Sequence, residues 1–195
     1  MDNNAAMAAQ IWLVPIILVV AALLCAAIAV WRAPRPVTLG VVIDKLLRYL
    51  FLFPLGLQGL WAFVGHVFFA EESAASIGWA PSPFQYEVGV ANLGLGLAAI
   101  YAAFRGFEAR AAVAIAAACF LAGAGVGHVR QILEEDNFAP GNAGSILFTD
   151  FLVPIVILVL LLLTPKQRPA SRLVDEIANA RQALEGALRN SKKVK

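Results

Sequence analysis

Five long apolar runs constrain the fold of this chain more than any other feature of its sequence. They cover approximately residues 10–31, 46–70, 83–104, 109–133 and 145–164. Each run can cross the roughly 30 Å hydrocarbon core of a bilayer as a helix. Lipid offers no hydrogen bonds to the backbone, so spans of this kind have to be helical. The runs therefore predict an all-α, five-span transmembrane bundle.

Composition supports a membrane protein and argues against an ordinary soluble domain. Hydrophobic residues make up 61% of the 195 residues and charged residues 14%, whereas a soluble domain is about half apolar and about a quarter charged. The first run follows a leader without Lys or Arg, so we expect a retained span rather than a cleaved signal peptide. We predict a transmembrane domain over residues 1–169 and a cytoplasmic tail over residues 170–195.

The tail has its own pattern, in which apolar residues recur at helical spacing among basic ones. This pattern predicts an amphipathic helix on the membrane surface, drawn there by anionic lipid. Contact with other membrane subunits is the alternative. Nucleic acid is not an expected partner, because Asp175, Glu176 and Glu185 dilute the basic charge of the tail.

The distribution of basic residues predicts the orientation in the bilayer. Every Lys and Arg except Arg130 falls in segment 32–48, in the turn 105–110 or after Pro165. With five spans, these three segments lie on one side, and basic segments stay in the cytoplasm. We therefore expect a multi-pass protein of a bacterial inner (plasma) membrane, with its N-terminus outside and its C-terminus in the cytoplasm.

Both histidines of the chain stand in the tripeptide Gly-His-Val, and a pair of glutamates and a later carboxylate follow each of them. The first copy consists of His66, Glu71, Glu72 and Glu87, and the second consists of His128, Glu134, Glu135 and Asp150. The spacing from the second glutamate to the last carboxylate is the same in both copies. The pattern predicts a two-helix unit that is used twice, as spans two and three and as spans four and five.

The predicted topology brings these groups to matching depths at the outer side. Spans two and four end soon after His66 and His128, whereas spans three and five begin shortly before Glu87 and Asp150. Ser82 begins span three as an N-cap, and Ser145 is expected to cap span five in the same way. Ionisable groups inside membrane helices usually mark function, so we expect a polar site here. The sequence predicts the depth of these groups and not the rotation of their helices.

A transition-metal site is the specific hypothesis for this cluster, with redox chemistry as its suggested use. Imidazole and carboxylate groups together suit iron, manganese, copper or zinc. His66 and His128 would supply nitrogen ligands, and Glu87 and Asp150 would supply oxygen ligands. The surrounding carboxylates are Glu71, Glu72, Glu134 and Glu135, and the residues expected to orient the ligands are Asn92, Gln131 and Arg130.

Two alternatives remain open at the level of sequence. Two histidines at equal depth on two spans could also hold a b-type haem between them. Alternatively, the protein has no cofactor and is a structural or accessory subunit, or a small transporter with an acidic outer vestibule. In that case each histidine pairs with a carboxylate, and Arg130 forms a salt bridge to Glu134 four residues on. The sequence has no nucleophile elbow and no phosphate-binding loop, so it assigns no reaction.

The region from Gly65 to Asn92, together with the region from Gly127 to Pro154, resembles a family of small bacterial polytopic membrane proteins of unassigned function. The resemblance rests on the Gly-His-Val segments, the Glu71-Glu72 pair, Ser82-Pro83-Phe84-Gln85, and Glu87 followed by Asn92. It leaves out the first span and the basic tail. The resemblance implies a polytopic membrane fold, draws attention to the same polar residues, and implies no activity.

Overall fold

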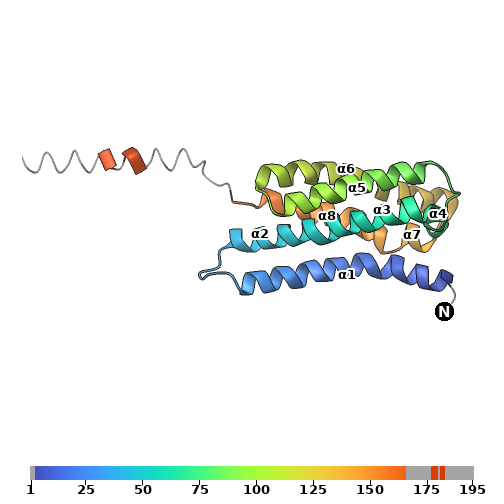
Figure 1. Cartoon of the computed structure of the whole chain (residues 1–195), viewed down its shortest axis with the longest axis horizontal. Coiled ribbons are helices and arrows are strands. Elements are labelled where there is room, and N and C mark those ends of the chain that lie inside the picture. The colour runs from blue at the N-terminus through green and yellow to red at the C-terminus, as the bar shows by residue number, and fades with distance from the viewer. Residues whose placement is uncertain (1–2, 166–176, 180, 183–195) are drawn as a thin grey trace, which may run out of the picture. The chain divides into compact units, whose positions relative to one another are not determined.

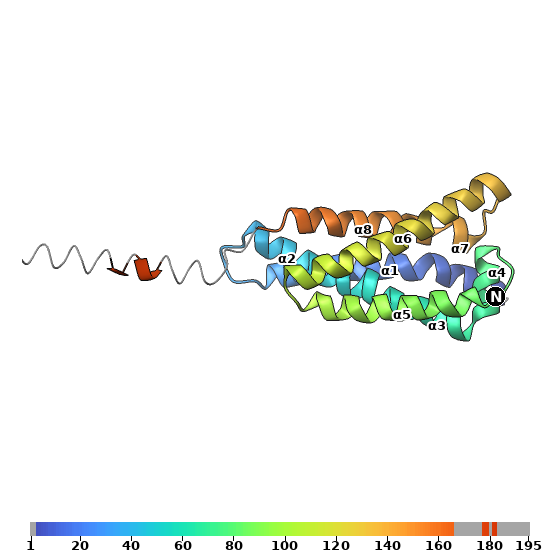
Figure 2. The same cartoon turned by 90° about the horizontal axis from the view of Figure 1, so that it is seen from above.

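Long helices that lie side by side make up the fold, as Figures 1 and 2 show. A computed structural model describes residues 3–165, 177–179 and 181–182, and every regular element in those ranges is helical. The elements are α1 (Asn3–Trp31), α2 (Leu39–Leu50), η1 (Phe51–Leu57), α3 (Gln58–Phe68), α4 (Ala70–Ile77), α5 (Phe84–Ala103), α6 (Phe107–Glu135), α7 (Pro140–Ala143) and α8 (Ser145–Leu162). All of them belong to one compact unit, Met1–Thr164, while Pro165–Lys195 form a second.

The five predicted spans are confirmed. Helices long and apolar enough to cross a membrane cover Ile11–Trp31, Leu39–Phe68, Phe84–Ala103, Phe107–Glu135 and Pro140–Leu162. The protein is therefore a multi-pass membrane protein, and the lipid bilayer is its surroundings. The second span begins earlier than predicted, at Leu39, where the Thr38 hydroxyl accepts a hydrogen bond from the Val41 N–H over 3.4 Å. Charged residues between 44 and 48 hid this first part of the span from a hydropathy argument.

The second span runs without interruption through α2, η1 and α3. Its middle part, Phe51–Leu57, is a π-helix that contains Pro54. Proline has no N–H to donate to the helix ladder, and π-turns often accommodate such a defect near functional sites. The turn ends just before Gln58, the polar residue in the middle of this span.

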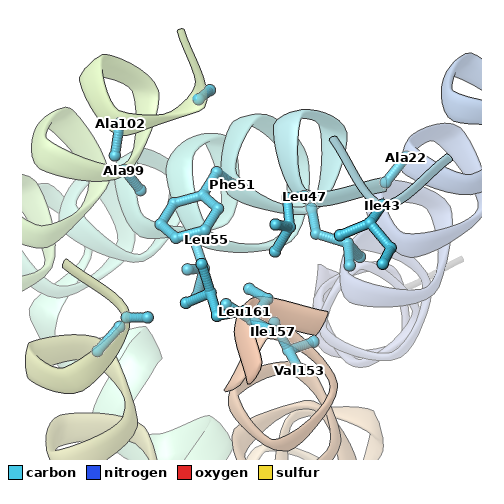
Figure 3. Close-up of a cluster of buried hydrophobic side chains, with 14 residues drawn as sticks. Ala22, Ile43, Leu47, Phe51, Leu55, Ala99, Ala102, Val153, Ile157 and Leu161 are labelled. Atoms are coloured by element: carbon cyan, nitrogen blue, oxygen red, sulfur yellow. The ribbon is translucent and has the colours of Figure 1, made fainter. Parts of the chain in front are cut away.

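The hydrophobic core lies where the second span meets α8 and α5, as Figure 3 shows. Phe51 and Ile157 are fully buried there, and Ala99 and Ala102 of α5 leave room for the Phe51 ring. Large apolar side chains also cover the outside of the bundle, with Leu162 at 85% exposure. Lipid-facing surfaces of membrane helices have this character.

Glycines let the second span and α5 approach each other closely. A Cβ atom on Gly96 would lie 2.9 Å from the Gly56 carbonyl oxygen and 3.1 Å from the Leu60 nitrogen. Both are backbone atoms that cannot rotate away, so only glycine fits here. Small residues at such contacts are typical of membrane helix pairs. The close packing fixes α3 against α5 and so positions His66 opposite the first turn of α5.

At the end of the bundle away from the histidines, a buried arginine joins three helices. Arg110 of α6 is 5% exposed, and its Nη1 donates to Asp44 Oδ1 of α2 over 2.9 Å. Its Nε and Nη2 donate to the carbonyl oxygens of Ala102 and Ala103 over 3.3 and 2.9 Å. These carbonyls belong to the last turn of α5, and the Ala102 carbonyl also accepts from the Arg105 N–H over 3.0 Å.

Two sequence predictions stay predictions. The amphipathic helix of the tail falls largely outside the described residues, which include only 177–179 and 181–182 of that segment. The duplicated unit also stays a prediction, and the partners of the two histidines differ between its copies, as described below.

Candidate functional site

A cavity of about 580 Å³ lies inside the bundle at the end where α3 and α5 meet α4 and α7. Side chains from all five spans and from α4 line it, and both His66 and His128 are among them. Most of the remaining lining is apolar and aromatic. The sequence predicted the depth of the two histidines, and the structure shows that they also face a common space.

His66 is held by a glutamine rather than by the predicted carboxylate. Its Nδ1 lies 2.5 Å from Oε1 of Gln85 in the first turn of α5. An amide oxygen only accepts hydrogen bonds, so Nδ1 carries the hydrogen and Nε2 has the lone pair. Gln85 is 5% exposed, whereas Glu87 two residues on is exposed on another face of the helix.

His128 is held by Asn142 of the short helix α7, and the local network fixes its tautomer. The Asn142 Nδ2 donates to the carbonyl oxygens of His128 and Asn137 over 3.2 and 2.8 Å. Its Oδ1 therefore has to face His128 Nδ1, at 2.8 Å. Because Oδ1 cannot donate, Nδ1 of His128 carries the hydrogen and Nε2 has the lone pair of the neutral ring.

Asp150 and Trp79 complete the surroundings of the His128 ring. Asp150 Oδ2 lies 3.7 Å from His128 Nε2, and the two residues are 4% and 8% exposed. The Trp79 ring stacks on the imidazole at a centroid distance of 6.4 Å and an interplanar angle of 30°. The prediction that Asp150 lies beside His128 therefore agrees with the geometry.

Helices α4 and α7 cover this end of the cavity and are joined to each other. Asn137 Nδ2 donates to the Ile77 carbonyl oxygen over 2.8 Å. Gly141 packs against Ser76, whose carbonyl oxygen would lie 2.9 Å from an added Cβ. Gly78 ends α4 with a φ of 80°, a conformation that favours glycine. The connection closes the bundle above Asn142 and fixes the position of α7.

The predicted carboxylates divide into those at the cavity and those on the surface. Asp150 and Glu72 line the cavity, although Glu72 is itself exposed at its edge. Four other carboxylates are exposed on the surface and do not line the cavity, namely Glu71, Glu87, Glu134 and Glu135. The predicted salt bridge between Arg130 and Glu134 is confirmed, with Nε 2.7 Å from Oε2. Among the expected orienting residues, Asn92 lines the cavity and Gln131 lines a separate depression with Glu135.

The predicted capping serines differ in what they do. The Ser82 hydroxyl accepts a hydrogen bond from the Phe84 N–H over 3.3 Å, close to the expected cap. Ser145 does not cap its helix, because its hydroxyl donates to the Ile11 carbonyl oxygen of α1 over 3.0 Å. α8 is thereby joined to the first span at the depth of the cavity.

Within residues 3–165 and the short described part of the tail, no three His, Cys, Asp or Glu residues gather as they would around a metal ion. Glu87 lies outside the cavity, and its predicted place beside His66 is taken by an amide. The arrangement can donate and accept hydrogen bonds. It also presents two imidazole nitrogens with lone pairs.

Sequence reasoning missed Gln85, Asn142 and Gln58. Gln58 lines the cavity, and its Oε1 is buried without a hydrogen-bond partner in the part of the chain that the structure describes. A lone amide in the middle of an apolar span was the signal that could have found it. Asn142 lies in a Pro-Gly-Asn stretch between spans, which carries no hydropathy signal.

Comparisons with known proteins give one match. The model of a family described as a family of unknown function matches residues 12–170. No curated protein and no solved structure matches the chain.

Proposed function

Because the chain belongs to DUF6790, a family of unknown function, we propose its role from its own residues: it binds a small molecule in the cavity that His66 and His128 line. The observation that carries this proposal is the cavity itself, with its volume of about 580 Å³. Ligand sites are typically about 300–1,000 Å³, mostly apolar, with a few placed polar groups. The cavity meets each of these conditions.

The hydrogen bonds behind the histidines support a role in recognition. Gln85 and Asn142 each engage an Nδ1 atom and leave the Nε2 atom of that ring with its lone pair. A side chain whose orientation and tautomer are fixed by a second residue is prepared to bind a ligand without further ordering. We propose that the two imidazoles and Asp150 form hydrogen bonds with the polar part of the ligand, while its apolar part fills the aromatic side of the cavity.

A metal or haem cofactor is the second candidate, and one observation favours it. Histidines that ligate metals usually donate their other ring N–H to an oxygen acceptor, and both histidines here do so. His66 and His128 would be the nitrogen ligands of iron, manganese, copper or zinc, or of a b-type haem, with Asp150 as the carboxylate nearest to them. We rank this candidate second because the described residues bring no third His, Cys, Asp or Glu to the pair formed by His128 and Asp150.

We also propose that the cavity lies at the extracytoplasmic side of the membrane. The turns 32–38 and 104–106, which contain Arg32, Arg35 and Arg105, are at the bundle end away from the cavity, and basic turns remain in the cytoplasm. Single-cysteine variants and a thiol reagent that does not cross membranes test the orientation. A cysteine at Glu71 should react in intact cells and one at Arg105 should not.

Blocking the cavity tests the proposed function. Ala124 of α6 lines the cavity, so Ala124→Phe should fill it, whereas Ala116→Phe places the same ring on an exposed position of the same helix. Protein purified from membranes in mild detergent should carry a small molecule in near-stoichiometric amount by native mass spectrometry. Ala124→Phe should reduce its occupancy at least tenfold, and Ala116→Phe should leave it unchanged.

The same preparation separates the candidates. Equal occupancy in the two variants, or no bound molecule in the unmodified protein, would contradict ligand binding in the cavity. A visible absorption spectrum with a Soret band would instead support haem. Stoichiometric metal that is lost on His66→Ala and His128→Ala would support a metal site.

A further inference from the structure

We infer that the ligand of this cavity is an organic cation, with a protonated amine and an apolar body. This inference rests on the proposed function and specifies its ligand class. The cavity wall is rich in hydrogen-bond acceptors and contains acidic groups, and both features favour such a ligand.

The amide side chains on the wall present oxygen atoms rather than N–H groups. The Gln58 Nε2 donates to Thr149 Oγ1 over 3.5 Å, and its Oε1 is buried without a hydrogen-bond partner among the described residues. The Asn92 Nδ2 donates to the Val88 carbonyl oxygen over 2.9 Å, so its Oδ1 is the atom left to accept. A buried polar atom costs free energy unless it is hydrogen-bonded. A ligand with N–H donors would satisfy these oxygens.

The imidazoles add further acceptors. With Nδ1 of His66 engaged by Gln85 and Nδ1 of His128 engaged by Asn142, each neutral ring offers its Nε2 lone pair. A ligand that carried only acceptors, such as an ether or a carboxylate, would meet lone pairs on most sides. An ammonium group brings up to three donors, which matches this wall.

Among the described residues, the cavity wall carries acidic side chains and no basic side chain with a permanent charge. The ionisable groups that line the cavity are Asp150, Glu72, His66 and His128, and the lining contains no Lys or Arg within the described parts of the chain. The nearest arginine in sequence, Arg130, is exposed on the outside of α6 and paired with Glu134. A buried charge needs a partner of opposite sign. A bound cation would be paired by Asp150 as a carboxylate and, at the edge, by Glu72, whereas an anion would find no Lys or Arg on the described wall to pair with.

The apolar walls favour an organic cation over a metal ion. Aromatic side chains line the cavity, namely Trp61, Phe69, Trp79, Phe84 and Phe120. The faces of aromatic rings attract cations, and tryptophan does so most strongly. A transition-metal ion needs several ligand atoms at one point, and no group of three His, Cys, Asp or Glu side chains meets that need over the described ranges. An ammonium group on an apolar body uses the whole cavity.

Three probes with the same carbon skeleton and different charge test the inference. Phenylpropylammonium is a cation at neutral pH, phenylpropanol is neutral, and phenylpropanoate is an anion. We expect isothermal titration calorimetry on the detergent-purified full chain to give at least tenfold tighter binding for the ammonium than for the alcohol. The anion should bind more weakly than the alcohol. Ala124→Phe, which blocks the cavity, serves to subtract partition into detergent.

Two charge-removing variants, one buried and one exposed, test the inference further. Asp150→Asn should remove most of the preference for the ammonium over the alcohol. Asp150 is 4% exposed, so this variant could fail to fold. The exposed Glu72→Gln is therefore measured alongside, with an expected loss of about threefold for the ammonium alone, consistent with a partly screened charge.

The outcomes also separate this inference from the proposed function. Equal binding of the ammonium and the alcohol, or tighter binding of the anion, with all binding lost in Ala124→Phe, would overturn the cationic ligand and leave cavity binding standing. If none of the probes binds while native mass spectrometry finds a neutral or acidic molecule displaced by Ala124→Phe, the inference is again overturned. Failure of both experiments removes the proposed function as well.

Discussion

Replacing Asn142 with leucine, which has a similar shape, should destabilise the protein more than any other single change at the site. Asn142 has 0% exposure and makes three hydrogen bonds, to His128 Nδ1, to the His128 carbonyl and to the Asn137 carbonyl. Leucine would leave the His128 Nδ1–H and the Asn137 carbonyl without a partner, and would remove one of the two donors to the His128 carbonyl, which also accepts within α6. Each unsatisfied buried group costs about 1–3 kcal/mol, so we expect a loss of about 3–5 kcal/mol. Denaturant unfolding in detergent measures it.

Two further variants show whether hydrogen bonding causes this effect. Asn142→Asp keeps the shape but turns a donor into an oxygen that faces two carbonyl oxygens, and it should be destabilising too. Asn92→Leu is the matched control, because the Asn92 side chain makes one hydrogen bond, to the Val88 carbonyl within its own helix. We expect the control to cost less than about 1 kcal/mol. Similar losses for Asn92→Leu and Asn142→Leu would show that the network around His128 is not special.

Arg110→Met should produce the second-largest loss, although it lies far from the cavity. Methionine keeps much of the aliphatic stem but removes the donors to Ala102, Ala103 and Asp44. The two alanines are fully buried, so the Ala103 carbonyl would lose its donor, whereas the Ala102 carbonyl would keep the Arg105 N–H. Asp44 is 40% exposed at its side chain and keeps Lys45 and Arg48 nearby, which limits the electrostatic part. We expect a loss of about 2–3 kcal/mol in thermal unfolding.

Arg105→Met is the control for Arg110. Arg105 lies in the same turn region, is exposed, and places its guanidinium 4.4 Å from the centroid of the Tyr101 ring. An exposed cation–π contact contributes about 0.5–1 kcal/mol. If Arg105→Met destabilised the protein as much as Arg110→Met, the buried network at α2, α5 and α6 would not be the cause.

The spans could be predicted from the sequence because their length and apolar character follow from bilayer thickness. The depth of His66 and His128 follows from the same argument, since each stands near the end of a span. Which residues meet inside the bundle depends on helix rotation, and five nearly uniformly apolar spans carry little periodic signal for it. Glu87 therefore looked like a ligand of His66, although the rotation of α5 turns Gln85 inward instead.

The partner of His128 could not be predicted for a different reason. Asn142 lies in α7, a helix of four residues between two spans. Its position depends on the contacts of α7 with α4 and α8 rather than on local sequence. The predicted repeat also gave the wrong partner, because Gln85 engages His66 from α5, whereas Asn142 engages His128 from α7. Equal spacing of carboxylates did not imply equal contacts.

The proposed binding site requires that His66 and His128 face a single cavity. The chain has 2 histidines, so replacing either one with glutamine assigns the ring ¹⁵N resonances of both. We predict that Ala124→Phe, which fills the cavity between α6 and the other spans, shifts the ring resonances of both histidines, and that Ala116→Phe shifts neither. A shift confined to one ring, or no shift in either, would contradict a shared cavity.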